Sequence, residues 1–293
     1  MKAFLFCLSI FVIVSTSAQA QPAKKKATTQ KSNTGIYQSL TFKNKPKDYI
    51  KIVYEEPDDS AFISWYNSFR EEKFLEGMRK VINDVFIIKK PLTLSTRTCG
   101  AINAFYSSEK KELTLCYEIL HFLYNFYESR YNDPDSLGHK IGMALTFIYF
   151  HEVGHALIDI LDIPITGKEE DAADYFSFYF LASNEVPEGV EATMEGANFF
   201  MDNYNKMIED TAYQRLKKEG KEPPLPFWDE HSLDMQRFYT IAALIYGSNP
   251  DKYDYFINAG YLGDRRPGIA ISEFKKIKKS WDRVLKPYIR FKK

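Results

Sequence analysis

The residues with the clearest chemical potential form the run His151-Glu152-Val153-Gly154-His155, which has the pattern HExxH. Apolar residues flank this run on both sides, as in a buried helix. Positions i and i+4 of a helix lie one turn apart on the same face, so both imidazoles can bind one metal ion. Glu152 would then lie beside the metal and act as general base toward water. Without a metal, these polar groups would need other partners in an apolar interior.

A third ligand is expected in the segment that follows. A short turn ends at Gly167, and the next predicted helix opens with the run Lys168-Glu169-Glu170-Asp171-Ala172-Ala173-Asp174. Glu170 and Asp174 are four residues apart, so their carboxylates share one helix face. One of them can complete the metal site and leave a position for water, and the other can accept the free ring N–H of a ligand histidine. An acidic helix start that complements the helix dipole explains the first acids of this run, but it explains Asp174 poorly.

HExxH followed by ExxxD resembles the gluzincin clan of zinc metallopeptidases. The resemblance implies one Zn²⁺ ion held by His151, His155 and Glu170. It also implies that Asp174 hydrogen-bonds to His151 from outside the ligand set. The gap between His155 and Glu170 is shorter than in several clan members, so Glu169 or Asp171 stays open as an alternative ligand.

A β-hairpin is predicted just upstream, with strands at 101–106 and 112–116 around a polar tip. Its first strand contains Asn103-Ala104-Phe105, similar to an edge strand that precedes the metal helix in some gluzincins and pairs with extended substrate. The resemblance therefore implies that Asn103 and Ala104 bind a peptide backbone as an added strand.

A third segment, residues 228–239, resembles a motif of a bacterial family of putative metallopeptidases, and this resemblance covers most of residues 46–285. Many active gluzincins have a Tyr or His that stabilises the transition state. His231 is the best candidate for that catalytic role here, and Arg237, a candidate substrate-binding residue, is the next. The alternative for His231 is a residue at a helix start that neutralises Asp229 and Glu230 beside it.

Apolar spacing predicts the elements that must position these residues. Besides the hairpin, it predicts strands at 49–54 and 91–96 and helices at 60–86, 117–131, 136–161, 168–183, 188–218, 230–247 and 270–285. The expected fold class is α+β and mostly helical. By resemblance it is zincin-like, with a small sheet and edge hairpin, then the active-site helix, then an α-rich C-terminal half.

The chain has 293 residues, with 39 Lys and Arg against 39 Asp and Glu. Zero formal charge and no long basic run argue against a nucleic-acid partner. Residues 1–20 have the charged start, apolar run and Ala18-Gln19-Ala20 ending of a signal peptide, and the run is too short to span a membrane comfortably. We therefore expect a secreted or periplasmic protein without a membrane anchor after cleavage. Residues 21–45 are predicted to be a flexible linker, and 46–293 one domain.

Two cysteines follow the predicted signal peptide, Cys99 and Cys116, and in an exported protein we expect them to form a disulfide. The main functional hypothesis is an exported zinc metallopeptidase acting on a peptide or protein substrate, with Glu152 as general base. The alternative is a metal-stabilised, non-catalytic binding protein of the cell envelope. A fourth protein ligand on the metal would favour that alternative. The sequence does not determine the oligomeric state.

Overall fold

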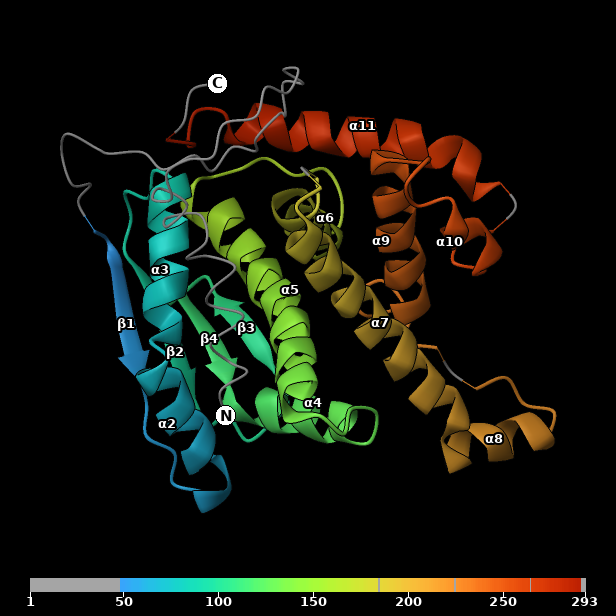
Figure 1. Cartoon of the computed structure of the whole chain (residues 1–293), viewed down its shortest axis with the longest axis horizontal. Coiled ribbons are helices and arrows are strands. Elements are labelled where there is room, and N and C mark those ends of the chain that lie inside the picture. The colour runs from blue at the N-terminus through green and yellow to red at the C-terminus, as the bar shows by residue number, and fades with distance from the viewer. Residues whose placement is uncertain (1–47, 184, 224, 264, 291–293) are drawn as a thin grey trace, which may run out of the picture.

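The computed structural model describes residues 48–183, 185–223, 225–263 and 265–290 (Figure 1). The predicted signal peptide (1–20) and linker (21–45) lie outside these residues. A four-stranded sheet has the order β1 (Ile50–Tyr54), β2 (Leu92–Arg97), β4 (Glu112–Cys116) and β3 (Ala104–Ser107). The rest of the described chain is largely helical, which confirms the predicted α+β class.

The sheet is mixed, and β3 forms one of its edges. β2 pairs in parallel with both β1 and β4, whereas β3 pairs with β4 in the antiparallel sense. The predicted hairpin is therefore present, with an edge strand that begins at Ala104 instead of residue 101. The residues before it form a bend in which Gly100 has φ +73°, a conformation unfavourable for other residues.

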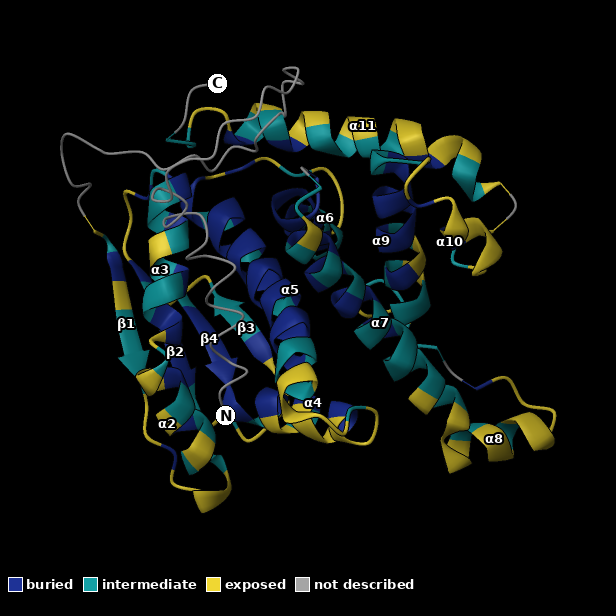
Figure 2. Cartoon of the chain, in the orientation of Figure 1, coloured by how far each residue is buried: buried dark blue, intermediate teal, exposed yellow. Residues whose placement is uncertain are grey.

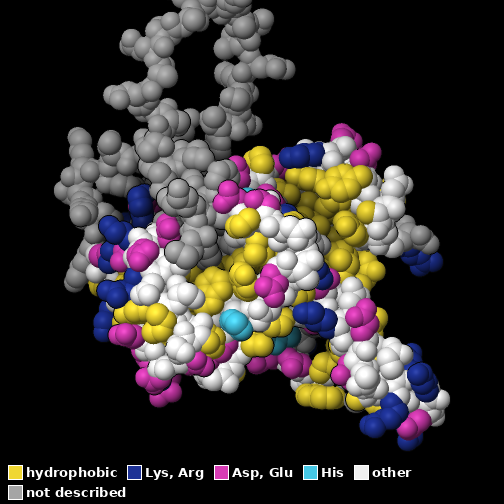
Figure 3. Space-filling view, turned by 60° about the horizontal axis from the view of Figure 1, so that its bottom comes forward, with side chains coloured by type: hydrophobic (Ala, Val, Ile, Leu, Met, Phe, Trp, Pro, Cys, Tyr) yellow, Lys and Arg dark blue, Asp and Glu magenta, His cyan; other side chains and the backbone are white. Residues whose placement is uncertain are grey.

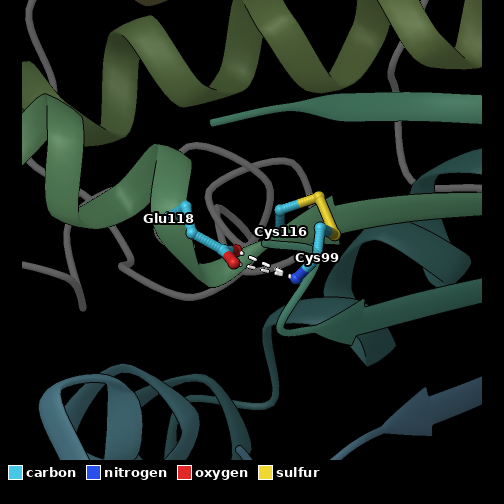
Figure 4. A group of neighbouring side chains, drawn as sticks. All are labelled: Cys99, Cys116 and Glu118. Carbon is cyan, nitrogen blue, oxygen red and sulfur yellow. Dashed lines mark hydrogen bonds between the residues drawn. A yellow bond between two sulfur atoms is a disulfide. The ribbon is translucent and has the colours of Figure 1, made fainter. Parts of the chain in front are cut away.

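A disulfide between Cys99 and Cys116 ties this bend to the end of β4 (Figure 4). The carboxylate of Glu118 supports the same bend by accepting hydrogen bonds from the backbone N–H groups of Cys99 (2.9 Å) and Gly100 (2.6 Å). The predicted cysteine pair is thus present, and it fixes the start of the edge strand.

Removing this disulfide in a Cys99→Ala/Cys116→Ala variant is expected to lower the free energy of unfolding by about 3 kcal/mol, as expected for a short closed loop. The two cysteines are 17 residues apart. Urea denaturation under non-reducing conditions measures the difference. A reducing agent should lower the free energy of unfolding of the wild type to that of the variant, and it should leave the free energy of unfolding of the variant unchanged. Equal stability of both proteins without reductant would contradict the expectation.

Helices follow the strands in the order of the chain, after a short 3₁₀ turn at Ser60–Phe62. They are α2 (Ile63–Glu71), α3 (Phe74–Val85), α4 (Tyr117–Glu128), α5 (Pro134–Ile160), α6 (Glu169–Leu181), α7 (Pro187–Glu209), α8 (Thr211–Lys218), α9 (Asp234–Ser248), α10 (Tyr255–Asn258) and α11 (Arg266–Leu285).

Three predicted helices are divided or shortened in the structure, and the helix predicted at 270–285 begins earlier, at Arg266. The helix predicted at 60–86 is broken at Lys73, which adopts a left-handed conformation with φ 53°. The helix predicted at 188–218 is divided at Asp210, whose side chain caps α8 by accepting from the N–H of Ala212. The helix predicted at 230–247 begins later, at Asp234. Periodicity persists across such breaks, so apolar spacing alone does not reveal them.

The central helix α5 lies between the sheet and the C-terminal helices and is buried along most of its length (Figure 2). Asp133 caps its start by accepting from the N–H of Ser136, and Pro134 occupies its first turn. Its length and mean hydropathy of 1.3 would suit a membrane span, but 94% of its most apolar window is buried in this fold. The apolar character of α5 thus reflects packing in the core.

The end of α7 and the whole of α8 project from this body as an arm (Figure 1). No residue of α8 is buried, and its last turn carries Arg215, Lys217 and Lys218. Figure 3 shows basic side chains at the end of this arm.

Candidate metal centre

Two helices and one loop bring the predicted site residues together. Helix α5 carries the HExxH run, helix α6 carries Glu170 and Asp174, and the loop before α9 carries His231. The two helices approach closely because Gly154 faces Ala173: a Cβ atom at position 154 would lie 3.1 Å from the Cα of Ala173. The small residues of both motifs therefore set the distance between the ligand-bearing helices.

Three ring and carboxylate atoms converge at one point between these helices. His151 Nε2 and His155 Nε2 are 3.2 Å apart, and Glu170 Oε2 lies 3.1 Å from the first and 3.4 Å from the second. Tetrahedral ligands at about 2.0–2.1 Å from a zinc ion are about 3.3–3.4 Å from one another. The three atoms therefore have the spacing of one face of a tetrahedral metal site.

Carboxylates hold the outer nitrogens of both rings. His151 Nδ1 lies 2.8 Å from Asp174 Oδ1, and His155 Nδ1 lies 2.8 Å from Glu169 Oε1. A carboxylate accepts a hydrogen bond, so in the neutral ring Nδ1 carries the proton and the Nε2 lone pair faces the common point. The Glu170 carboxylate therefore lies near the Nε2 atoms of both rings, whereas Glu169 contacts Nδ1 of His155.

Asp171, the other alternative ligand, accepts a hydrogen bond from the Ser232 hydroxyl at 2.7 Å. Each acid at the start of α6 thus has a separate contact.

Burial alone would raise the pKa of Glu170, but its hydrogen bonds with His151, His155 and His231 lower that pKa well below its usual range.

His231 also lies close to this group of atoms. Its Nε2 lies 3.0 Å from Glu170 Oε2, and its Nδ1 lies 2.9 Å from Asp229 Oδ1. Its side chain is 42% exposed, in contrast to 7% for His151. His231 therefore belongs to the site and faces solvent, and its ring is oriented by a carboxylate two residues earlier.

Arg237 was predicted to bind substrate, but the structure pairs it with Asp174. Arg237 Nε and one terminal nitrogen donate to the two carboxylate oxygens of Asp174 at 2.7 and 2.8 Å. The guanidinium also stacks on Phe200, 3.7 Å from the ring centroid, and the side chain is only 11% exposed. Its donors thus orient Asp174, which in turn orients His151. Burial would raise the pKa of Asp174, but Arg237 and His151 lower it strongly.

Glu152 is buried, with 7% of its surface exposed, and burial raises its pKa. Its carboxylate accepts a hydrogen bond from the backbone N–H of Tyr106 on β3. The Tyr106 hydroxyl donates to Asp159, one turn beyond His155 on α5. The edge strand is thereby fixed directly against the helix that carries the HExxH run.

The two residues predicted to bind substrate backbone have different positions on the edge strand. The carbonyl of Asn103 accepts a hydrogen bond from the N–H of Cys116 at 3.2 Å, so its backbone faces β4. Backbone groups alternate along an antiparallel strand, which directs those of Ala104 to the outer edge. Ala104 therefore has the geometry for strand addition, and the backbone of Asn103 does not.

Two of the following contacts were not predicted from the sequence, and the third, between Asp229 and His231, was considered only as charge neutralisation. Glu169 binds His155, Asp229 binds the ring of His231, and Lys168 donates to the carbonyl oxygens of Asp229 (3.1 Å) and His231 (3.2 Å). One of these contacts had a signal in the sequence: Asp229 lies two residues before His231, close enough for its carboxylate to reach the ring.

The model of the family described as putative metallopeptidase matches residues 54–285. The chain belongs to this family. The match includes every residue of the centre described above. Membership supports a metallopeptidase-like function, and with it a bound metal ion and a peptide or protein substrate. Searches of curated proteins and of solved structures found no match to the chain.

Replacing Arg237 by Gln is expected to weaken metal-ion binding about 10- to 100-fold, the range typical of residues that orient a metal ligand. The physical reason is that Asp174 loses the two donors that direct it toward His151. The dissociation constant is measured against a competing chelator.

Arg130 offers a matched control for this substitution. It stacks on Phe126, 4.3 Å from the ring centroid, and pairs with Asp202 at 2.6 Å. Arg130→Gln removes the same kind of pair between the turn after α4 and helix α7, and it should leave metal affinity unchanged. Equal loss of affinity in both variants would indicate a general effect on folding instead of positioning of Asp174.

Proposed function

We propose that the chain is an exported zinc-dependent metallopeptidase with a zincin-like domain at residues 46–293. The observation that carries this proposal is that His151 Nε2, His155 Nε2 and Glu170 Oε2 lie 3.1–3.4 Å from one another. The buried carboxylate of Glu152 lies on α5, the helix that carries both histidines. Two nitrogens and one carboxylate are ligands that suit Zn²⁺. The predicted signal peptide supports export.

His151, His155 and Glu170 would hold the zinc ion, which would supply Lewis-acid chemistry toward the scissile carbonyl and water. Glu152 accepts the proton from the attacking water and then donates it to the leaving amine. Burial raises the pKa of Glu152, and a higher pKa makes its carboxylate a stronger proton acceptor. The N–H of Tyr106 keeps its carboxylate oriented.

His231 is proposed to donate a hydrogen bond to the oxygen that becomes negative in the transition state. Hydrogen bonding to Glu170 and Asp229 raises the pKa of His231, although burial opposes the change. When the ring is protonated it has a donor on each nitrogen, so Nδ1 can bind Asp229 while Nε2 donates to the substrate. The peptide backbone is proposed to pair with the outer edge of β3 at Ala104.

The alternative is a metal-stabilised binding protein without turnover. The observation that favours it is the short distance from His231 Nε2 to Glu170 Oε2, 3.0 Å, which places a third imidazole near the metal ligands. If His231 bound the metal, four protein ligands would close the site, as in structural zinc centres.

The deciding experiment uses the mature chain and measures bound metal together with hydrolysis of a fluorogenic peptide library. The proposal expects one zinc ion per chain, cleavage that a chelator abolishes, and recovery on adding Zn²⁺. Stoichiometric zinc without cleavage of any peptide would favour the binding protein. A chain that binds no metal would contradict both functions.

Zinc affinity is expected to fall as pH decreases. Burial alone would lower the pKa of His151, but Asp174 and Glu170 raise it to about 9 in the metal-free protein. Charged His151 therefore stabilises the metal-free fold fully below its unfolded pKa of about 6.5, and this contribution is lost as pH rises through 9. Zinc binding must displace that proton. For each proton released, the affinity for zinc therefore falls about tenfold when the pH is lowered by one unit. Chelator competition at pH 6, 7 and 8 measures this trend, and a constant affinity would contradict it.

A further inference from the structure

The large hydrophobic side chains with the greatest exposure in the described residues lie close in the chain to residues of the candidate metal centre and of the edge strand. Trp228 is 79% exposed, Phe227 is 75% exposed and Ile102 is 57% exposed. Phe227 and Trp228 lie in the loop that leads to His231, and Ile102 lies just before the edge strand β3. Adjacent aromatic side chains so open to water commonly mark a binding surface.

The loop that carries the aromatic pair is fixed to the helix that supplies Glu170. Lys168 donates to two backbone carbonyls of this loop, at 3.1 and 3.2 Å, and Ser232 donates to Asp171 at 2.7 Å. The N–H of Asp229 donates to the carbonyl of Pro226 at 3.0 Å, which closes a turn around Phe227 and Trp228. The pair is therefore held at a defined place beside the metal ligands.

The cavity behind this loop is unsuited to an apolar group. It measures about 180 Å³ and is lined mostly by charged and polar residues, with one aromatic and one aliphatic side chain: Asp171, Asp174, Tyr175, Ser232, Gln236, Arg237, Thr240 and Ile241. A large hydrophobic side chain placed there would leave charged and polar groups without water. On this side of the centre, the aromatic pair offers the apolar contact that the cavity does not.

The acids next to the pair argue against a lipid surface as its occupant. Asp229 and Glu230 follow Trp228 directly, and both are exposed. Anionic lipid headgroups would be repelled by these carboxylates. An uncharged, apolar part of the substrate meets no such repulsion.

We propose that Phe227 and Trp228 bind a large apolar side chain of the substrate close to the scissile bond. The substrate class is then peptides, or unfolded protein segments, with an aromatic or branched aliphatic residue at that position. This inference rests on the proposed peptidase function. It makes the pair a specificity determinant, because a hydrophobic contact changes kcat/KM about 10- to 200-fold.

The test compares fluorogenic peptides that differ at one position only, with Phe or Ala at each site around the scissile bond. The wild type is expected to cleave the best Phe peptide at least about tenfold more efficiently than its Ala counterpart. A Phe227→Ala/Trp228→Ala variant is expected to lose this preference, mainly through a higher KM for the Phe peptide. Its zinc content should stay close to wild type.

Tyr255→Ala is the matched control, because Tyr255 is an aromatic residue of α10 that is 53% exposed and outside the site. It should retain the full preference. Binding of the same peptides to zinc-loaded protein, measured by fluorescence anisotropy, gives a readout that does not depend on turnover. Cleavage with an unchanged Phe preference in the double variant would overturn this inference and leave the peptidase function intact. Absence of both cleavage and peptide binding in the wild type would overturn both.

Discussion

Replacing Glu152 by Gln is expected to lower kcat/KM about 10²- to 10⁴-fold while the protein retains its zinc. Glutamine fits the same space and can still contact the Tyr106 N–H, but it cannot accept the proton of the attacking water. Metal content is determined on the same samples as the rates, so that loss of chemistry is separated from loss of the ion.

Glu195→Gln is the control for this substitution. Glu195 is a glutamate with the same exposure, 7%, and it pairs with Lys140 at 2.7 Å on helices α5 and α7, away from the site. Its replacement should leave kcat/KM nearly unchanged. If Glu152→Gln kept wild-type rates with zinc bound, the general base would have to be another group.

The second large effect concerns the acids at the start of α6. Glu170→Ala is expected to weaken zinc binding more than about 10²-fold, beyond the range for residues that only orient a ligand, and to abolish hydrolysis at ordinary zinc concentrations. The reason is that its Oε2 completes the group formed by the two Nε2 atoms. Zinc should also stop protecting the variant against thermal unfolding, since binding to the folded state stabilises it.

The neighbouring acids provide the matched controls. Glu169→Ala removes the partner of His155 Nδ1 and should weaken zinc binding about tenfold, whereas Asp171→Ala loses the contact with Ser232 and should affect zinc least. This graded order follows from the observed contacts. A larger loss at position 169 than at 170 would show that the acids exchange roles when the metal binds.

The local part of the centre could be predicted from the sequence. HExxH on an apolar helix places both histidines on one face, and Glu170 and Asp174 share a face for the same reason. The hairpin and the disulfide were also foreseen, from alternating residues and from the expected export. These features depend on neighbours within a few residues, and periodicity records such neighbours directly.

Contacts between distant segments could not be predicted in the same way. Three adjacent acids were candidates for the third ligand, and only the approach of α6 to α5 at Gly154 and Ala173 brings Glu170 to both rings. The side chain of Arg237 offered the chemistry of a substrate anchor, yet α9 directs it onto Asp174.

The sequence by itself determined which side chains can act together: two imidazoles, a base and an acid on successive helices, preceded by an edge strand. Only the tertiary structure decided which acid reaches the rings, which partner orients each ring, and which backbone groups of the edge strand face outward. The physical reason is that a helix or strand fixes the direction of its side chains through local geometry. The element that such a face meets depends on packing among residues far apart in the chain.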